Sequence, residues 1–340
     1  MRTESSAEIK VRELTGLKPG NISREVLDSD EPLVLRGLVS DWPCVREGIQ
    51  GKAAILSYLR DFCRDQEVML FRGPPEINGR FFYNEDLTGF NFDKTSSMLD
   101  SLLTRFGSLT DGEDEPSLYI GSTSVDGAFP GFRQDNDLSL QDLKPLVSIW
   151  MGNRTRIAAH FDIPDNIACV VAGHRRFTLF PPEQLANLYV GPLDFTPAGQ
   201  AISMVDFHHP DYQRYPLFRK AEEAALVVDL TPGDAVYIPS MWWHHVESLD
   251  SFNILVNYWW RSLPAIMGAP MDALLSALLS IKGLPADQKR AWRLMFEHYI
   301  FADEADLFSH IPEQSLGILG QLDEATARQL NSILRGKPVR

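Results

Sequence analysis

The chain has few cysteines and no long apolar run. Only Cys44, Cys63 and Cys169 occur among its 340 residues, without C-x-x-C spacing, and such a sparse, odd set favours a reducing compartment over a disulfide framework. Its longest apolar stretches, such as residues 273–281, fall short of the roughly 20 residues that cross a bilayer, and the polar N-terminus does not resemble a secretory signal. We therefore expect a soluble cytoplasmic protein without a membrane partner.

Basic residues are also scarce. Lys and Arg number 32 against 46 Asp and Glu, so the net charge is −14. Binding to a nucleic-acid backbone needs clustered positive charge, and nucleic acid is therefore not the expected partner. Hydrophobic residues make up 44% of the chain, which is enough to form a core without disulfides or metal.

The pattern of apolar residues divides the chain into three parts. Residues 1–116 mix helix and strand, with a strand expected at 31–39 and helices at 52–63 and 96–106. Residues 117–261 contain many short strands separated by Gly, Pro and Asp turns, which indicates a mainly β sandwich or barrel. A long insert at 185–219 interrupts them and is more typical of a functional loop than of an idle one. Residues 262–340 are helical, and their apolar stripes either pack on their own barrel or pair with a second subunit.

Two segments of the barrel carry a candidate metal site. His160 and Asp162 lie two apart on an expected strand, so both point to one face, although an H-x-D pair alone is weak evidence. The second segment, residues 231–248, runs from a Pro-Gly-Asp turn into a histidine pair. His244 shares the inward face of Val246, and His245 points away. Two histidines and one carboxylate leave an open coordination shell, as in non-haem Fe(II) oxygenases, whereas structural zinc uses four ligands, usually with cysteine.

Polar residues on inward faces indicate a ligand pocket. Arg175 shares a face with Phe177 and Leu179, and a buried cation is costly unless it meets an anion. Arg175 therefore either holds the carboxylate of a bound diacid or pairs with a protein carboxylate. The inward-facing amides of Asn166 and Asn257 either bind ligand or satisfy backbone groups, and the Tyr119 hydroxyl offers a further contact.

Several collinear segments between residues 31 and 261 resemble the JmjC (cupin-like) hydroxylases, and most of all the asparaginyl hydroxylase that acts on hypoxia-inducible factor. These segments are EPLVLRG (31–37), WMGN with AAHFD (150–162), GHRRFTLFPP (173–182), VDFHHPDYQRYPLF (205–218), PGDAVYIPSMWWHHVES (232–248) and VNYWW (256–260).

The resemblance implies a double-stranded β-helix (jelly-roll, cupin) core with flanking helices and a C-terminal helical dimerisation region. For residues 262–340 it therefore favours pairing in a homodimer over packing on their own barrel. It implies Fe(II) at His160, Asp162 and His244, with 2-oxoglutarate and O2 as co-substrates. The implied 2-oxoglutarate contacts are Tyr119, Asn166, Arg175 and Asn257. Two departures stand out: Arg175 replaces the usual Lys, and residues 201–204 lack the polar, substrate-facing side chains of the asparaginyl hydroxylase.

Together these features predict a 2-oxoglutarate-dependent dioxygenase that hydroxylates a C–H bond on a protein or peptide side chain. Trp243 and Trp259 either wall the substrate cleft or pack in the core. The competing hypotheses are an oxygenase acting on a small molecule or a tRNA base, a metallo-cupin without oxygenase activity (an isomerase or a metal-dependent binding protein), and a catalytically silent scaffold dimer.

Overall fold

The structure is a computed structural model that describes residues 10–110, 112, 114–197, 199–261, 266–302 and 307–336. It divides into two compact units, Met1–Ser262 and Leu263–Arg340, and each is described by itself. Every strand of the described residues belongs to the first unit, and the described part of the second unit is helical. The predicted boundary at residue 116, inside the first unit, stays a prediction.

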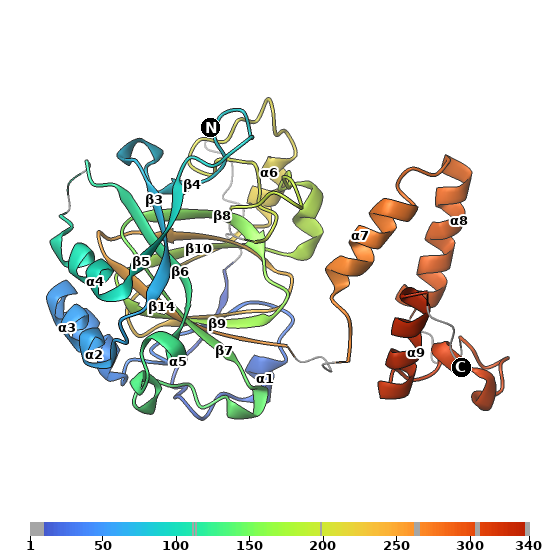
Figure 1. Cartoon of the computed structure of the whole chain (residues 1–340), viewed down its shortest axis with the longest axis horizontal. Helices are drawn as coiled ribbons and strands as arrows, with labels where there is room; N and C mark the ends of the chain where they lie inside the picture. Colours follow the sequence, from blue (N-terminus) through green and yellow to red (C-terminus); the bar gives the residue numbers. More distant parts are fainter. Residues whose placement is uncertain are drawn as a thin grey trace, which may run out of the picture. The chain divides into compact units, whose positions relative to one another are not determined.

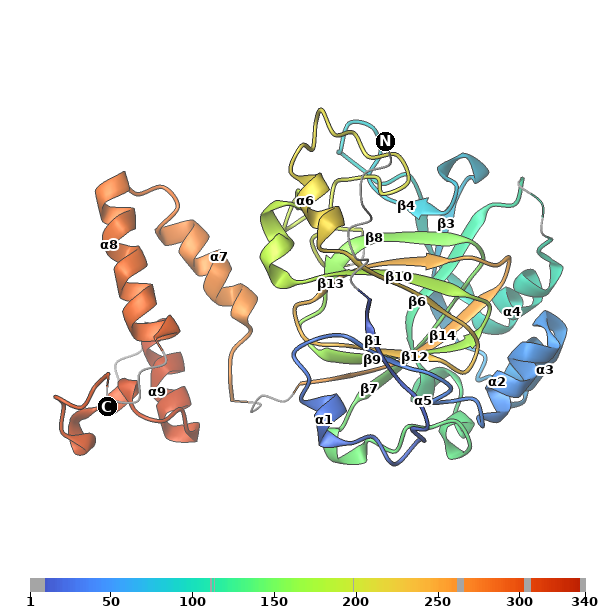
Figure 2. The ribbon, with the colours of Figure 1, turned by 180° about the vertical axis from the view of Figure 1, so that it is seen from behind.

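Two β-sheets build the first unit (Figure 1). The larger has the strand order β1-β2-β12-β9-β14-β7-β6-β3-β5, and the smaller has the order β11-β10-β13-β8-β4. From β7 to β14 the chain alternates between the sheets, except that β10 and β11 are neighbours in the smaller one. Figure 2 shows from behind the end of the larger sheet that holds β1, β12 and β9. This alternation is that of a jelly roll and confirms the predicted mainly β, cupin-like fold.

The strands of the N-terminal part are β1 (Arg12–Leu14), β2 (Leu33–Leu35), β3 (Glu67–Gly73), β4 (Arg80–Phe81), β5 (Asp93–Met98) and β6 (Ser117–Ser124). The strands that follow are β7 (Leu146–Gly152), β8 (Thr155–Phe161), β9 (Asp165–Ala172), β10 (Arg175–Phe180), β11 (Leu226–Leu230), β12 (Ala235–Ile238), β13 (Trp243–Ser248) and β14 (Asn253–Trp260).

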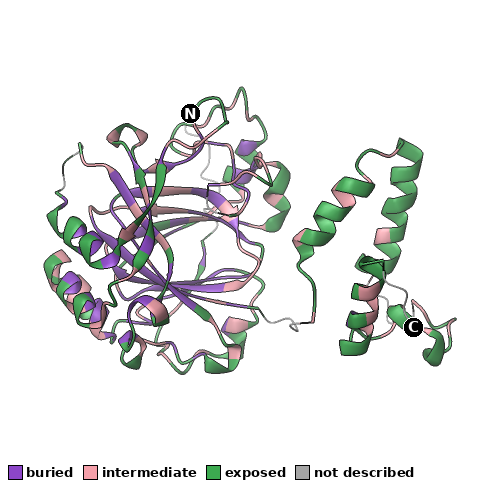
Figure 3. Cartoon of the chain, viewed as in Figure 1, coloured by how far each residue is buried: buried purple, intermediate pink, exposed green. Residues whose placement is uncertain are grey.

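Helices cover the outer face of the larger sheet. The main ones are α2 (Pro43–Gln50), α3 (Lys52–Phe62) and α4 (Leu99–Ser108), beside the short α1 (Arg24–Leu27) and α5 (Val125–Ala128). Their buried apolar side chains join one cluster with outward-facing residues of the sheet, among them Leu103 of α4 and Ile167 of β9. Figure 3 shows this one-sided burial of the helices.

The helix expected at residues 96–106 begins later in the structure. Residues 96–98 belong to β5 instead, because they pair with β3 in the order Ser96 with Met69, Ser97 with Val68 and Met98 with Glu67. The amphipathic period of the helix sequence gave no sign of this long-range pairing, which decides the local conformation.

A second apolar cluster fills the space between the two sheets. On β9, Ala168 and Val170 face this interior cluster, whereas Ile167, Cys169 and Val171 face the helices. Since both faces of β9 are covered, its sequence from Ile167 to Ala172 is an unbroken apolar run rather than an alternating one. Polar residues that point into this interior therefore stand out from the apolar side chains around them.

The second unit contains α7 (Pro270–Ser280), α8 (Ala286–Phe296) with a π-helical turn at Glu297–Phe301, and α9 (Glu324–Leu334). This confirms the predicted C-terminal helices. Neither α7 nor α8 has a buried residue, and large apolar side chains are exposed, such as Leu279 at 90% and Leu294 at 66%. Within the described ranges of the whole chain, no helix combines the length and the apolar character that crossing a membrane requires.

Candidate active site

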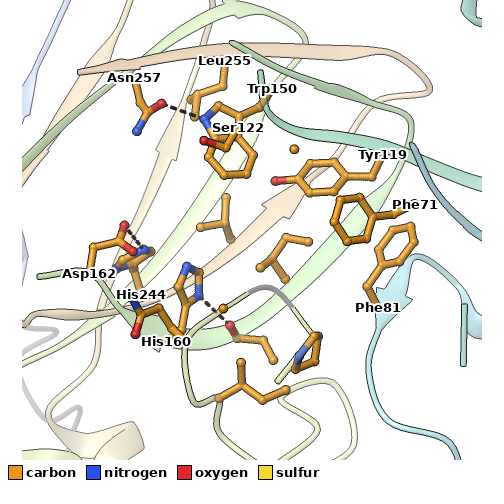
Figure 4. Close-up of a pocket in the computed structure, with 18 of the residues that line it drawn as sticks. Phe71, Phe81, Tyr119, Ser122, Trp150, His160, Asp162, His244, Leu255 and Asn257 are labelled. Carbon is orange, nitrogen blue, oxygen red and sulfur yellow. Dashed lines mark hydrogen bonds and ion pairs between the residues drawn. The ribbon is translucent and has the colours of Figure 1, made fainter. Parts of the chain in front are cut away.

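The three predicted metal ligands lie together inside the jelly roll. His160 on β8 and His244 on β13 are directly paired residues of the smaller sheet, and their ring centroids are 4.3 Å apart. Asp162 follows one residue after the end of β8. One ligand atom from each of the three side chains lies within 4.8 Å of the other two. Figure 4 shows the three side chains converging on one side of a pocket.

A β-bulge adjusts the pairing beside these residues. Between paired positions, β8 advances three residues, from Ile157 to His160, while β13 advances two, from Val246 to His244. The extra residue therefore lies on β8, as in a β-bulge that redirects side chains near a site. His245 faces away from the triad and stacks on Phe207 with ring centroids 4.7 Å apart. The structure thus places His244 in the cluster and His245 outside it, as alternation along the strand predicts.

Backbone carbonyls orient both imidazole rings. Nδ1 of His160 lies 2.9 Å from the carbonyl oxygen of Ala158, and Nδ1 of His244 lies 3.1 Å from that of Trp242. A carbonyl only accepts hydrogen bonds, so each Nδ1 carries the donated proton, and Nε2 is the ring nitrogen of each histidine that is left for a metal. Nε2 of His244 is 3.5 Å from Oδ2 of Asp162. Histidines that bind metals are held in this way by a second partner.

The protonation states suit a cation. Burial, reinforced by the neighbouring His244, lowers the pKa of His160 to about 4, so this imidazole is neutral at pH 7. Burial tends to raise the pKa of Asp162, but a hydrogen bond and the charge of His244 outweigh it and hold that pKa below its ordinary value. An ionised carboxylate beside a neutral imidazole is the donor set that a divalent transition metal needs.

A pocket of about 430 Å³ opens beside the three residues, and we call it the central pocket. Its wall includes all four predicted 2-oxoglutarate contacts, Tyr119, Asn166, Arg175 and Asn257. Sequence positions between 119 and 257 thus meet around one cavity. Whether they contact a co-substrate stays a prediction.

Arg175 is the buried cation of this pocket. Its side chain is 2% exposed, and Nε and Nη2 have no hydrogen-bond partner among the described residues. Burial lowers the pKa of Arg175 to about 10, so it is still charged at pH 7. Within the same part of the chain no carboxylate forms an ion pair with it, contrary to the alternative in which a protein acid neutralises Arg175. An unpaired guanidinium in such a place fits the carboxylate of a diacid.

The two pocket amides are partners of each other. Asn257 Nδ2 donates to Asn166 Oδ1 at 3.4 Å, and Asn257 Oδ1 accepts a 2.7 Å hydrogen bond from the indole of Trp150. Figure 4 shows this contact and the Tyr119 hydroxyl directed into the pocket. Burial raises the pKa of Tyr119, which keeps the phenol protonated. Trp150 was not singled out in the sequence, although it begins the WMGN segment.

The two tryptophans expected at the cleft differ in their positions. Trp259 lines the central pocket and makes an edge contact with Trp150, with ring centroids 5.6 Å apart. Trp243 packs instead against Phe161, at 5.0 Å between centroids, and lies outside the residues that line the pocket. Adjacent residues of a strand point to opposite faces, so the inward position of His244 turns Trp243 outward. The core-packing alternative applies to Trp243.

The N-terminal part contributes more to the pocket than its sequence suggested. Phe71 on β3, Phe81 on β4, and Phe92 and Lys94 from the β5 region all line it. The alternation of residues along EVMLFRG, with Met69 and Phe71 on one face, was the local signal for an inward-facing side of β3. No local signal showed that β3 pairs with β6.

The chain is similar to several known proteins. The Cupin-like domain family matches residues 19–266. JmjC domain-containing protein D of Dictyostelium discoideum is 27% identical over 252 residues, which cover 68% of this chain and 52% of that protein. Lysine-specific demethylase JMJ31 of Arabidopsis thaliana is 28% identical over 265 residues, which cover 68% of this chain and 46% of that protein. tRNA wybutosine-synthesizing protein 5 of Gallus gallus is 34% identical over 106 residues, 31% of this chain and 30% of that protein.

The match to the family extends over most of the first unit and includes all the residues that line the central pocket. The chain spans about half the length of the first two relatives. The match therefore does not assign the activities of those whole proteins to this chain. Because the family match covers well over half of the sequence, this protein belongs to the cupin-like domain family and has relatives of the JmjC type.

Proposed function

We propose that this protein is an Fe(II)- and 2-oxoglutarate-dependent dioxygenase that hydroxylates a C–H bond of a protein or peptide side chain. The observation that supports this most strongly is the pairing of two features in one pocket. A cluster of two histidines and one aspartate leaves coordination positions open, and a buried arginine in the same cavity has no anion of its own among the residues that the structure describes.

In this proposal His160, Asp162 and His244 hold the iron, which supplies the redox chemistry when O2 and 2-oxoglutarate are bound. The protein contributes orientation. The carbonyl groups of Ala158 and Trp242 fix the two imidazole rings, so that no reorganisation is needed when the metal binds. Arg175 pairs with the carboxylate of 2-oxoglutarate that is remote from the metal.

The polar residues of the pocket would orient the same co-substrate. Asn166 and Asn257 already share one hydrogen bond, so each keeps further capacity for a ligand. The protonated Tyr119 can donate from its hydroxyl. The apolar wall formed by Phe71, Phe81 and Phe177 limits the access of water to the site, which strengthens these polar contacts.

Oxygen-dependent conversion of 2-oxoglutarate to succinate tests the proposal. Purified protein with Fe(II) should form succinate, and Arg175→Ala should lose most of this turnover because its affinity for 2-oxoglutarate falls. Arg176→Ala is the matched control, since Arg176 faces outward and pairs with Asp229 at 2.7 Å and 2.8 Å. A metallo-cupin without oxygenase activity does not need Arg175. Equal succinate yields with and without O2 would favour this alternative over the dioxygenase.

The substrate class is a proposal of its own. The names of the relatives include a lysine-specific demethylase and a tRNA wybutosine-synthesizing protein, so the family does not fix one class. We favour a protein or peptide because the acidic chain, of net charge −14, is unsuited to backbone contacts with RNA. Asparagine is not carried over from the asparaginyl hydroxylase, since Ile202 lines the pocket in the divergent segment 201–204. Mass shifts of about 16 daltons in a cell extract treated with the protein would identify the target.

We also propose that the second unit pairs two copies of the chain. Its support is the exposure of large apolar side chains on α7, α8 and the following turn, including Leu279, Leu294 and Ile300, which water-exposed helices of a monomer rarely display together. Light scattering of the full chain should give twice the mass of one chain, and Leu294→Glu with Ile300→Glu should give a monomer. A monomeric wild-type protein would refute the proposal. Cytoplasmic location likewise stays a prediction.

A further inference from the structure

One wall of the central pocket is apolar, apart from a single lysine. This wall consists of Met69, Phe71, Phe81, Phe92 and Lys94, and we call it the outer wall. Figure 4 shows two of its members, Phe71 and Phe81, on the side of the pocket away from Asp162 and His244. The polar residues expected to bind 2-oxoglutarate include none of the outer wall, so this wall faces whatever else enters the pocket.

Strand pairing fixes the order of the side chains along this wall. Tyr119 on β6 is the partner of Phe71 on β3, and Phe71 is the partner of Lys94 on β5. Paired residues of adjacent strands share a face, so the three form one row, with Lys94 at the edge strand. With a strand spacing of about 4.8 Å, Lys94 begins roughly 10 Å from the strand of Tyr119. The lysine thus lies at the outer end of a row that begins among the co-substrate residues.

The Lys94 ammonium group lies above aromatic rings. Its Nζ is 4.8 Å from the ring centroid of Phe90, 5.5 Å from that of Phe71 and 5.8 Å from that of Phe92. Over the described ranges of the chain, no carboxylate forms an ion pair with this amine, and partial burial alone lowers the pKa of Lys94. The rings hold the cation in place by cation–π attraction without supplying a counter-charge.

When the site is filled, the charge of Lys94 is not balanced by the other charges in the pocket. If the proposed function holds, divalent iron and Arg175 together balance Asp162 and doubly charged 2-oxoglutarate, and an electrostatic account has to include the ion's own charge. Among the described residues that line the pocket, the remaining side chain with a full charge is Lys94. Its positive charge is free to meet an anion on the primary substrate.

We propose that the primary substrate is an apolar acid, whose aromatic or aliphatic body packs on the outer wall and whose carboxylate pairs with Lys94. This inference rests on the oxygenase chemistry of the proposed function and specifies the chemical character of the substrate. The same chemistry occurs in a free carboxylic acid and in a peptide with an acidic residue beside an apolar one. Contact with the rings supplies the affinity for the apolar body of the substrate. The lysine fixes the position of the carboxylate, and this orientation decides which C–H bond faces the metal.

Calorimetric titration of the full chain, anaerobic and loaded with Fe(II) and 2-oxoglutarate, tests this pairing without turnover. The probes are 3-phenylpropanoate and its neutral amide, together with the capped dipeptides acetyl-Phe-Glu-amide and acetyl-Phe-Gln-amide. The acid member of at least one pair should bind the wild-type protein about tenfold more tightly than its neutral counterpart, the ratio that one charge-assisted contact gives. Preference within the first pair indicates a free acid, and preference within the second indicates a peptide.

Substitutions assign the preference to Lys94. Lys94→Gln should bring the ratio of the two affinities to about one, and Lys94→Glu should favour the amide. Lys220→Gln, on α6 (Phe218–Glu223) and outside the pocket, should keep the wild-type ratio. Equal affinities in both pairs, no binding of any probe, or an unchanged ratio in Lys94→Gln would overturn the inference. The iron–2-oxoglutarate absorption band of the same samples distinguishes this failure from failure of the proposed function, which would abolish the band in the wild-type protein itself.

Discussion

The backbone N–H of Ser240 donates a 3.0 Å hydrogen bond to the carboxylate of Asp165. This contact joins the turn before β13, which leads to His244, to the first residue of β9, which follows the turn that contains Asp162. Two further hydrogen bonds join the same turns, from the Ser240 hydroxyl to the carbonyl of Ile163 and from the N–H of Met241 to the carbonyl of Asp162 at 2.9 Å. The turns thus position two of the three candidate ligands relative to each other.

Removal of this link should weaken metal binding. Asp165→Ala deletes the acceptor of Ser240, so the turn that leads to His244 loses one of its anchors. We expect the affinity for Fe(II) to fall by about 10- to 100-fold, the usual effect of losing a group that orients metal ligands, with the fold retained by circular dichroism. Competition with a chromophoric chelator measures the affinity. Asp229→Ala, which removes a surface ion pair with Arg176, is the control, and equal affinity in the two variants would contradict the prediction.

Replacement of Arg175 by lysine tests why this chain has Arg where the resembled hydroxylases usually have Lys. Lys restores the residue usual in the asparaginyl hydroxylase group but loses the planar pair of donors. Arg175→Lys should bind 2-oxoglutarate more weakly than the wild-type protein and more tightly than Arg175→Ala. Equilibrium dialysis with labelled 2-oxoglutarate gives the three affinities. If Arg175→Lys is no better than Arg175→Ala, the surroundings of residue 175 are shaped for a guanidinium and not merely for a positive charge.

Acid should destabilise the fold through Asp234. Its carboxylate accepts hydrogen bonds from Arg36 at 2.8 Å and from the N–H of Gly37 at 2.9 Å. Burial tends to raise the pKa of Asp234, but the hydrogen bonds from Gly37, Thr231 and Arg36 outweigh it and hold that pKa below its ordinary value. The folded-state pKa therefore lies below the unfolded value of about 3.9, and the stabilisation is present above about pH 4 and is lost as the pH falls through the folded-state pKa.

Urea denaturation of Asp234→Asn measures this contribution. The free energy of unfolding should fall by about 1–3 kcal/mol at pH 7, because an amide cannot replace the charge-assisted contacts. Between pH 5 and pH 3, the free energy of unfolding of Asp234→Asn should decrease less than that of the wild-type protein. Asp142→Asn, at an exposed position, should follow the wild-type pH dependence. Identical acid profiles for Asp234→Asn and the wild-type protein would exclude Asp234 as the source.

The N-terminal helices should unfold together with the barrel. Phe106 of α4 is fully buried and packs on Phe252 with ring centroids 5.6 Å apart. Phe106→Ala should lower the free energy of unfolding by about 3–5 kcal/mol, with the same transition seen by tryptophan fluorescence and by circular dichroism. Two separate transitions in the first unit would instead support residues 1–116 as an independent domain.

Local sequence patterns were sufficient for the strands of the barrel and for the face to which each candidate ligand points, whereas the meeting of His244 with His160 depends on the pairing of β13 with β8. His160 and Asp162 are two residues apart, so their common face follows from the period of a strand. The inward direction of Arg175 follows in the same way from Phe177 and Leu179. These predictions needed no knowledge of which strands are neighbours.

Other features depend on pairing between distant segments. Phe71 and Lys94 reach the pocket because β3 pairs with both β6 and β5, and the hydrophobic pattern of a single strand does not specify its partners. The bulge on β8 is likewise invisible in the sequence, because it appears only when β8 is aligned with β13. Trp243 differs from these cases, since alternation from His244 predicts its outward direction.

Anaerobic titration with Fe(II) and then 2-oxoglutarate, followed by visible absorption, tests most directly whether His160, Asp162 and His244 form an iron site with an open coordination shell. The wild-type protein should develop the weak charge-transfer band of the chelate at one equivalent of each, and His160→Ala and Asp162→Ala should show no band while remaining folded. Absence of the band from the folded wild-type protein, or a band of full intensity in His160→Ala, would contradict the account.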